Sequence, residues 1–272
     1  MLYYAHIFSK SMYNNEPYLS VIIVTWNSAA DIDVCLTSLK QSLGQFSSEV
    51  FVVDNKSSDK TVDIVRKKHP WVKLLPQSTN WGFGEGNNIG LAQAKGKYIW
   101  LLNPDTKVNE RAVRIMVRFL ERHRTVGAVG PEQLNGKGEL IIMKSKWSVS
   151  GLVEHFIEKI AQVIRGKTVI LFLFPHKVYM LNCGCVMLRN DILPSRQWFD
   201  PKCFIYGEEE YLFSAINQTK WKSYFLRNCS IEHYREKSIG QTGKKWKYAL
   251  DSFIILPVQV KIAALLSKIK TA

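Results

Sequence analysis

The sequence of 272 residues lacks several features that would assign a chain to a class at once. Its five cysteines are odd in number and include no C-x-x-C pair, so we predict reduced thiols and neither a disulfide framework nor a zinc site. No apolar run approaches the roughly 20 residues that a membrane-spanning helix needs. The opening MLYYAHIFSK has no basic start before a long apolar region, so we expect no signal peptide.

Charge and composition narrow the class further. Lys and Arg number 37 against 23 Asp and Glu, which gives a net charge of +14. This excess favours anionic partners such as nucleic acid, acidic lipid or phosphorylated substrates, and does not choose among them. Hydrophobic residues at 46% and charged residues at 22% are typical of a globular chain with a sizeable core.

Buried strands and helices alternate along the first half of the chain. The pattern predicts strands over residues 19–26, 49–54, 71–76 and 98–102, with helices over 32–43, 57–70 and 89–94. Continuous apolar strands separated by helices indicate right-handed βαβ units and a parallel sheet. We therefore predict an α/β fold with a mostly parallel central sheet flanked by helices, in which ligands bind beyond the carboxyl ends of the strands.

The second half is less regular. Helices are predicted over 109–124, 151–166 and 207–221, and strands over 177–189 and 224–231.

Two aspartates follow buried strands. Asp54 ends EVFVVD, and Asp105 follows the run YIWLLNPDT, in which Pro104 fixes the backbone where the strand ends. Carboxylates at this edge can hold Mg²⁺ or Mn²⁺, which neutralises a diphosphate. Asn-Pro-Asp-Thr is also a good turn sequence, so these residues alone leave a ligand site and a simple turn open.

A glycine-rich stretch, NWGFGEGNNIG over residues 80–90, is predicted to be a loop that approaches a ligand closely. Asn80, Asn87 and Asn88 add amide groups suited to a base or a sugar. The spacing is not G-x-G-x-x-G, so the dinucleotide fingerprint fails. A tight loop without a ligand is the alternative.

Carboxylates and a histidine in the second half complete the candidate residues. Glu208, Glu209 and Glu210 open a predicted helix, where the helix dipole already favours them, but one of them could act as a general base. His233 follows a strand-like run. A single histidine is more often structural than a ligand, and it gains interest only together with Asp105.

Taken together, these segments resemble the inverting nucleotide-sugar glycosyltransferases of family 2, in their rhamnosyltransferase-like branch with a GT-A fold. The resemblance covers roughly Leu19 to Gly240. It consists of motifs in the family's order: SVIIVTWN, VVDNKSSDKT, NWGFGEGNNIG, LLNPDT, NCGCVMLR, WFDPKCFIYGEEEYL and IEHYREKSIG.

The resemblance implies roles for particular residues. The implied nucleotide-sugar-binding residues are Thr25, Asn27, Asp54, Asn80, Gly82, Phe83, Asn88, Asn103 and Asp105. Because Asn103 replaces the first acid of the family's metal motif, Asp105 alone would hold Mn²⁺ or Mg²⁺ there, with His233 as the second metal candidate. The family's catalytic Asp corresponds to Glu209, although the neighbouring Glu208 is also a candidate for this role. Tyr211 replaces the Asp that the family usually has two positions later.

The resemblance also implies an activity. A sugar would pass from dTDP-rhamnose or a UDP-hexose to a hydroxyl of a glycan or lipid-linked glycan, with inversion, in bacterial cell-surface polysaccharide or lipopolysaccharide synthesis. We expect an N-terminal extension (1–18), one GT-A domain (19–240) with a donor half (19–108) and an acceptor half (109–240), and a basic amphipathic segment (241–272). Nucleic acid is not an expected partner, and the sequence does not indicate an oligomeric state.

The basic regions raise the question of a membrane. Residues 244–270 mix lysines, aromatics and apolar residues, and Arg111, Arg114, Arg118 and Arg122 form a helical stripe. A core helix pair and a solvated helix face are the plain explanations. The net charge favours binding to an acidic membrane surface, at the cytoplasmic face of the plasma membrane.

Rival classes fit less well. An NAD-type oxidoreductase would need the absent G-x-G-x-x-G motif. A non-catalytic lipid- or polyanion-binding α/β module would not need acids and a histidine at these positions. A sugar-1-phosphate nucleotidyltransferase would need a basic glycine-rich loop after the first strand, where the chain has TWNSAADI.

Overall fold

The structure is a computed structural model, and it describes residues 16–44, 46–141, 175–201, 203–204 and 207–234. Three predictions fall outside the described residues: the helix over 151–166, the C-terminal segment 241–272 and all but the end of the extension 1–18.

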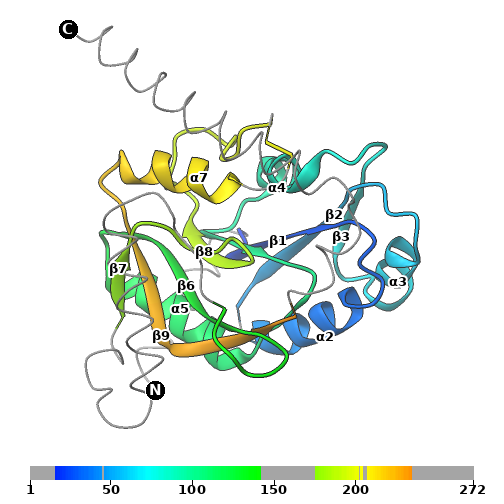
Figure 1. Cartoon of the computed structure of the whole chain (residues 1–272), viewed down its shortest axis with the longest axis horizontal. Helices are drawn as coiled ribbons and strands as arrows, with labels where there is room; N and C mark the ends of the chain where they lie inside the picture. Colours follow the sequence, from blue (N-terminus) through cyan, green and yellow to red (C-terminus); the bar gives the residue numbers. More distant parts are fainter. Residues whose placement is uncertain (1–15, 45, 142–174, 202, 205–206, 235–272) are drawn as a thin grey trace, which may run out of the picture.

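Four parallel strands form one half of a single sheet (Figure 1). They are β1 (Leu19–Thr25), β2 (Ser48–Asp54), β3 (Lys73–Pro76) and β4 (Tyr98–Leu102), arranged in the order β3-β2-β1-β4. All residues of β1 and β4 are buried, as expected for apolar strands covered on both faces. The predicted parallel sheet is confirmed here, and it places the carboxyl ends of these strands at one edge.

The other half of the sheet mixes parallel and antiparallel pairs. Its strands are β5 (Thr106–Lys107), β6 (Val126–Leu134), β7 (His176–Val178), β8 (Cys185–Arg189) and β9 (Lys222–His233). β8 runs antiparallel to β4 and β6, whereas β9 runs parallel to β6. The sequence had not predicted β6, because its two glycines and Pro131 are typical of turns, and the pairing with β9 shifts register at Pro131.

Helices cover both faces of the sheet (Figure 1). They are α2 (Ile32–Leu43), α3 (Thr61–Lys68), α4 (Gly82–Gln93), α5 (Glu110–Arg122) and α7 (Glu208–Asn217). One core joins α2, α3 and α5 to side chains such as Val21 and Trp100, and the other joins α4 and α7 to Ile22 and Leu101. Successive residues of a strand thus pack into the two cores on opposite faces of the sheet. Within the described residues, none of the helices combines the length and apolarity needed to cross a membrane.

The glycine-rich stretch is a helix and not the predicted loop. α4 begins at Gly82, and two of its four glycines, Gly86 and Gly90, lie four residues apart on the side that faces β1. A Cβ on Gly86 would lie 2.7 Å from Val24 Cγ1, and one on Gly90 would lie 2.5 Å from Ile22 Cγ2. The glycines therefore let the helix pack directly against the strand, which outweighs their poor helix propensity.

Candidate functional site

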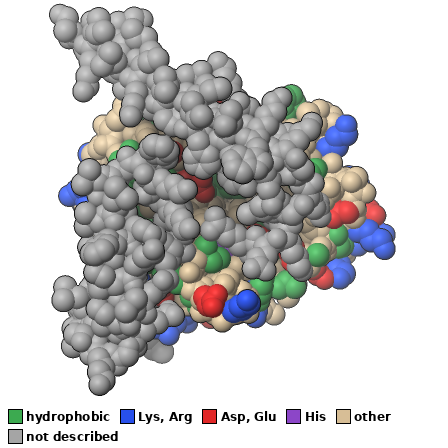
Figure 2. All heavy atoms as spheres, viewed as in Figure 1, with side chains coloured by type: hydrophobic (Ala, Val, Ile, Leu, Met, Phe, Trp, Pro, Cys, Tyr) green, Lys and Arg blue, Asp and Glu red, His purple; other side chains and the backbone are tan. Residues whose placement is uncertain are grey.

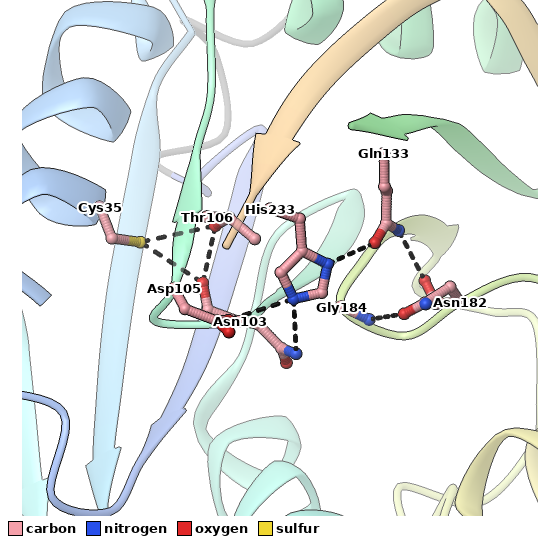
Figure 3. Close-up of polar contacts among 8 residues, drawn as sticks. All are labelled: Cys35, Asn103, Asp105, Thr106, Gln133, Asn182, Gly184 and His233. Atoms are coloured by element: carbon pink, nitrogen blue, oxygen red, sulfur yellow. Dashed lines mark hydrogen bonds and ion pairs between the residues drawn. The ribbon is translucent and has the colours of Figure 1, made fainter. Parts of the chain in front are cut away.

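Asp105 and His233 meet at the edge of the sheet, beyond the end of β4 (Figure 3). Strand β5 pairs with β9 so that Thr106 lies opposite His233, and the backbone N–H of Tyr234 donates to the carbonyl of Asp105 at 2.9 Å. His233 Nε2 is then 3.1 Å from Asp105 Oδ1, with the two residues 2% and 5% exposed. Residues 128 positions apart in sequence thus share one buried polar site.

The turn that carries Asp105 is held from behind by α2 (Figure 3). Thr106 Oγ1 donates to the Asn103 carbonyl at 2.7 Å, and the buried Cys35 thiol lies 3.6 Å from the same oxygen. Burial, with a smaller contribution from the Asp105 carboxylate, raises the pKa of Cys35 to about 12. The thiol therefore stays neutral near pH 7 and serves as a support of the turn.

The residues around Asp105 and His233 fit a divalent cation. His233 Nδ1 lies 2.7 Å from Gln133 Oε1 and donates to it, so in the neutral imidazole Nε2 carries a lone pair that faces Asp105. A lone pair and a carboxylate oxygen at 3.1 Å repel each other unless a proton or a cation joins them. Asn103 Nδ2 also lies 3.4 Å from Nε2, and its buried Oδ1 has no hydrogen-bond partner among the described residues.

The donor set is nevertheless small. Among the described residues, no group of three or more His, Cys, Asp and Glu side chains lies close enough to hold a metal ion. One imidazole, one carboxylate and one amide oxygen would leave several coordination positions of Mn²⁺ or Mg²⁺ to water or to substrate oxygens. Such an open site is typical of metal ions that bind phosphates.

Asp54 and Thr25 lie side by side at the ends of β2 and β1. The Asp54 carboxylate accepts hydrogen bonds from Thr25 Oγ1 at 3.0 Å, from Ser57 Oγ at 2.6 Å and from the Ser57 N–H at 2.9 Å. A carboxylate offers about four acceptor positions. Asp54 therefore shapes the loop after β2 and keeps room for roughly one further partner.

Asn27 is joined to that same loop. Its side-chain oxygen accepts from the Ser58 N–H at 2.8 Å, and its own N–H donates to Ser57 Oγ at 2.8 Å. Asn27 and the neighbouring Lys56 have positive φ values of 50° and 58°. Non-glycine residues in this region are uncommon and cluster at functional sites, which agrees with a ligand at this edge.

The predicted binding residues around α4 connect this helix to the segment before α7. Asn80 Oδ1 accepts from the Gly82 N–H at 3.0 Å, and Phe83 packs edge-on against Phe199. Asn88 makes hydrogen bonds of 2.9 and 3.1 Å to the backbone C=O and N–H of Phe199. Both ends of the Asn88 amide are therefore occupied by the Phe199 backbone. Contacts of these side chains with a nucleotide sugar stay predictions.

Glu208 and Glu209 reach the same part of the molecule from α7. Glu208 is 5% exposed and Glu209 is half-buried. Burial, and then the negative charges of Glu209 and Glu208, raise the pKa of the Cys183 thiol, so both carboxylates lie near Cys183. The adjacent Gly184 contacts the imidazole of His233, because a Cβ there would lie 2.5 Å from His233 Cε1. Cys183 thus lies near the carboxylates of α7, and the adjacent Gly184 lies against His233.

Figure 2 shows Asp and Glu side chains near the centre of one face of the molecule.

Sequence reasoning missed Gln133, Cys35 and Thr106. Gln133 lies on β6, a strand that the turn-like sequence hides, and a single glutamine carries no motif. Cys35 lies in the predicted helix over 32–43 and Thr106 lies in the LLNPDT motif, but no spacing in the sequence indicates that these side chains support the Asn103 carbonyl.

Several proteins resemble this chain. N-acetylglucosaminyl-diphospho-decaprenol L-rhamnosyltransferase of Mycobacterium tuberculosis is 21% identical over 242 residues, which cover 82% of this chain and 78% of that protein. Poly(ribitol-phosphate) beta-N-acetylglucosaminyltransferase TarS of Staphylococcus aureus is 32% identical over 124 residues, or 44% of this chain, and the match spans only 22% of its length.

Solved structures share the fold. S. aureus TarS 1-349 in complex with UDP-GlcNAc has a TM-score of 0.61 at 19% identity, over 82% of this chain and 61% of that one. Mannosyltransferase PcManGT from Pyrobaculum calidifontis, in complex with GDP-Man and Mn²⁺, has a TM-score of 0.59 at 17% identity, over 87% and 65% of the two chains. These likenesses confirm the predicted GT-A fold.

The family model described as "Glycosyl transferase family 2" matches residues 20–194, which is more than half of the sequence, and the chain therefore belongs to glycosyl transferase family 2.

Proposed function

We propose that this protein transfers a sugar from a nucleoside-diphosphate donor, dTDP-rhamnose or a UDP-hexose, to a hydroxyl of a glycan, with inversion of the anomeric centre. The observation that carries the proposal is the contact of 3.1 Å between Asp105 and His233 at the carboxyl edge of the sheet. In open α/β sheets this edge is where ligands bind. A polar pair that a divalent cation can join at this edge suits a diphosphate.

Asp105, His233 and the Asn103 amide are the residues that would hold the cation. When bound, Mn²⁺ or Mg²⁺ supplies positive charge that offsets the charge developing on the departing nucleoside diphosphate. An imidazole in the donor set favours Mn²⁺ over Mg²⁺, which prefers oxygen ligands alone. Thr25 and Asp54, at the ends of the next two strands β1 and β2, would face the nucleoside, with Asn27 beside them.

Glu209 is the proposed general base. It would take the proton from the acceptor hydroxyl as the hydroxyl oxygen attacks the anomeric carbon and the diphosphate leaves from the opposite face. One such displacement inverts the anomeric centre. Glu209 is half-buried whereas Glu208 is 5% exposed, so Glu209 is the better placed of the two to meet an acceptor.

The names of related proteins support an acceptor in cell-surface polysaccharide. The mycobacterial relative is named for N-acetylglucosaminyl-diphospho-decaprenol, and another relative is minor teichoic acid biosynthesis protein GgaB of Bacillus subtilis, 25% identical over 230 residues. We infer that the acceptor is a glycan, either free or linked to a polyprenyl diphosphate lipid. Lipopolysaccharide and capsule are included in this class.

An acidic membrane surface is the proposed location, at the inner face of the plasma membrane. The exposed side of α5 carries Arg111, Arg114, Arg118 and Arg122, and the whole chain has a net charge of +14. Basic side chains near an acidic leaflet contribute about 1 kcal/mol each to binding. A lipid-linked acceptor would be met at the same surface.

A panel of nucleotide sugars tests the proposal without knowledge of the acceptor. The protein is incubated with dTDP-rhamnose, UDP-glucose, UDP-GlcNAc and GDP-mannose, each with Mn²⁺, with Mg²⁺ or with a chelator. We expect slow, metal-dependent release of nucleoside diphosphate from one donor, measured by chromatography, because water can take the place of the acceptor hydroxyl as the nucleophile. Failure to bind or cleave any donor in either metal would contradict the proposal.

A further inference from the structure

Gln133 is buried, and both the oxygen and the nitrogen of its side-chain amide form hydrogen bonds. It lies on β6 and is 4% exposed. Its Nε2 donates to the carbonyl oxygen of Asn182 at 3.4 Å, and its Oε1 lies 2.7 Å from His233 Nδ1 (Figure 3). Because a carbonyl oxygen accepts only from the NH₂ end, the amide oxygen is the end that faces His233.

This orientation fixes the proton on His233. A glutamine oxygen can only accept, so Nδ1 must carry a hydrogen, and in the neutral imidazole Nε2 is then without one. Nε2 points to Asp105 Oδ1 at 3.1 Å and to Asn103 Nδ2 at 3.4 Å. The atom left with a lone pair is therefore the one directed at the candidate cation site.

The same contact also selects the orientation of the ring. A rotation of 180° about the bond to the imidazole would exchange Nδ1 with Cδ2 and Nε2 with Cε1. Gln133 would then face a carbon, and no nitrogen would face Asp105. Gly184 closes the other side, since its missing Cβ would stand 2.5 Å from His233 Cε1.

We propose that Gln133 is a positioning residue, which holds His233 in the Nδ1–H tautomer and so presents the Nε2 lone pair to a divalent cation beside Asp105. The inference rests on the proposed function, because it assumes that His233 is a metal ligand. Metal-binding histidines commonly donate their second N–H to a carbonyl or carboxylate, and loss of that partner typically weakens metal binding 10- to 100-fold.

The tautomer can be read directly on the metal-free protein. Histidine labelled with ¹⁵N is observed by long-range ¹H–¹⁵N spectroscopy at a pH where the ring is neutral, and the His233→Ala variant assigns the signal. We expect Nδ1–H for His233 in the wild type and in Gln133→Glu, which keeps an acceptor of the same reach. Gln133→Leu and the shorter Gln133→Asn lose the acceptor and should populate Nε2–H. An unchanged tautomer in both would overturn the proposal.

Binding of Mn²⁺, measured by electron paramagnetic resonance, tests the consequence. We expect Gln133→Leu and Gln133→Asn to weaken Mn²⁺ binding by about tenfold or more, and Gln133→Glu to bind as tightly as the wild type or tighter. Gln77→Leu is the matched control, because the Gln77 amide donates to the Leu75 carbonyl away from this site. It should bind Mn²⁺ like the wild type.

Two failures are distinguishable. If His233→Ala loses affinity for Mn²⁺ while Gln133→Leu and Gln133→Asn keep it, the role of Gln133 is wrong and the proposed function stands. If His233→Ala also binds Mn²⁺ like the wild type, the metal assignment itself fails, and the role of Gln133 fails with it. Thermal melting of each variant shows which are folded, and Gln133→Asn keeps the test valid if the Leu variant does not fold.

Discussion

Glu209 is the residue on which the proposed chemistry depends most. Replacing it with Gln keeps the size of the side chain and removes the base, so transfer should fall by about 10²- to 10⁴-fold. Binding of the nucleotide sugar should be unchanged, because Glu209 would act on the acceptor. Transfer assays and calorimetric titration of the donor measure the two effects.

The neighbours of Glu209 supply its controls. Glu210→Gln makes the same chemical change one residue further along α7, where we propose no catalytic role, and should retain activity. If Glu208→Gln abolishes transfer and Glu209→Gln does not, the base is the more deeply buried of the two acids.

Asp105 should act on the donor and not on the acceptor. In Asp105→Ala the turn keeps its backbone contacts, since the hydrogen bond from Tyr234 goes to the Asp105 carbonyl. We therefore expect a folded protein in which added Mn²⁺ no longer strengthens donor binding in calorimetric titration. Unchanged metal-dependent affinity would show that Asp105 is only a turn residue.

Single residues were predictable where a motif or a strand end marked them. Asp54 and Asp105 stand directly after apolar runs, and His233 belongs to a recognisable closing motif. The contact of Asp105 with His233 was inferred from the resemblance, since nothing in the spacing of residues 105 and 233 indicates it. Gln133 could not be found, because its role depends on the packing of β6 against β9.

At the level of elements, α4 shows how packing overrides local propensity. Gly86→Ala would improve helix propensity by up to about 1 kcal/mol, but its Cβ would lie 2.7 Å from Val24 Cγ1. Overpacking typically costs about 1–3 kcal/mol. We expect a net loss of stability in chemical denaturation, whereas Gln93→Ala on the exposed side of the same helix should change little. A more stable Gly86→Ala protein would mean that the strand moves away easily.

The C-terminal end of α5 is joined to the sheet by a polar cluster. Glu121 accepts hydrogen bonds from Tyr18, from Tyr98 at 2.9 Å and from Lys97 at 2.5 Å. Burial alone would raise the pKa of Glu121, but these hydrogen bonds, led by that of Lys97, outweigh it and hold the pKa below its usual 4.5. The charged form is therefore the one that the folded state prefers.

This cluster predicts a pH dependence of stability. A carboxyl group with a lowered folded pKa stabilises the protein above its unfolded pKa, and the contribution disappears as the pH falls through the folded value. Glu121→Gln should cost about 1 kcal/mol near pH 7, and the difference from the wild type should shrink below about pH 4.5. Urea denaturation at several pH values measures it. A difference that stays constant down to pH 3 would contradict the pKa assignment.

For the whole molecule, the first half was predictable and the second only in part. Residues 19–102 alternate buried strands with helices, a local pattern that fixes parallel pairing. In the second half β6, β8 and β9 pair across long sequence separations and in both directions, so no local pattern reports their order. The candidate site spans both halves, and the sequence therefore indicated its members more readily than their arrangement.

The charge of the whole molecule leads to the last prediction. We expect the protein to float with vesicles that contain acidic phospholipid at low salt, and not with neutral vesicles. Replacing Arg111, Arg114, Arg118 and Arg122 by Gln should weaken this binding at least about tenfold. A control with Lys137, Lys177, Lys220 and Lys222 replaced by Gln loses the same charge from exposed positions outside α5. Equal losses of binding in the two variants would mean that net charge alone causes the binding. Unchanged binding of the α5 variant would show that the four arginines do not contact the membrane surface.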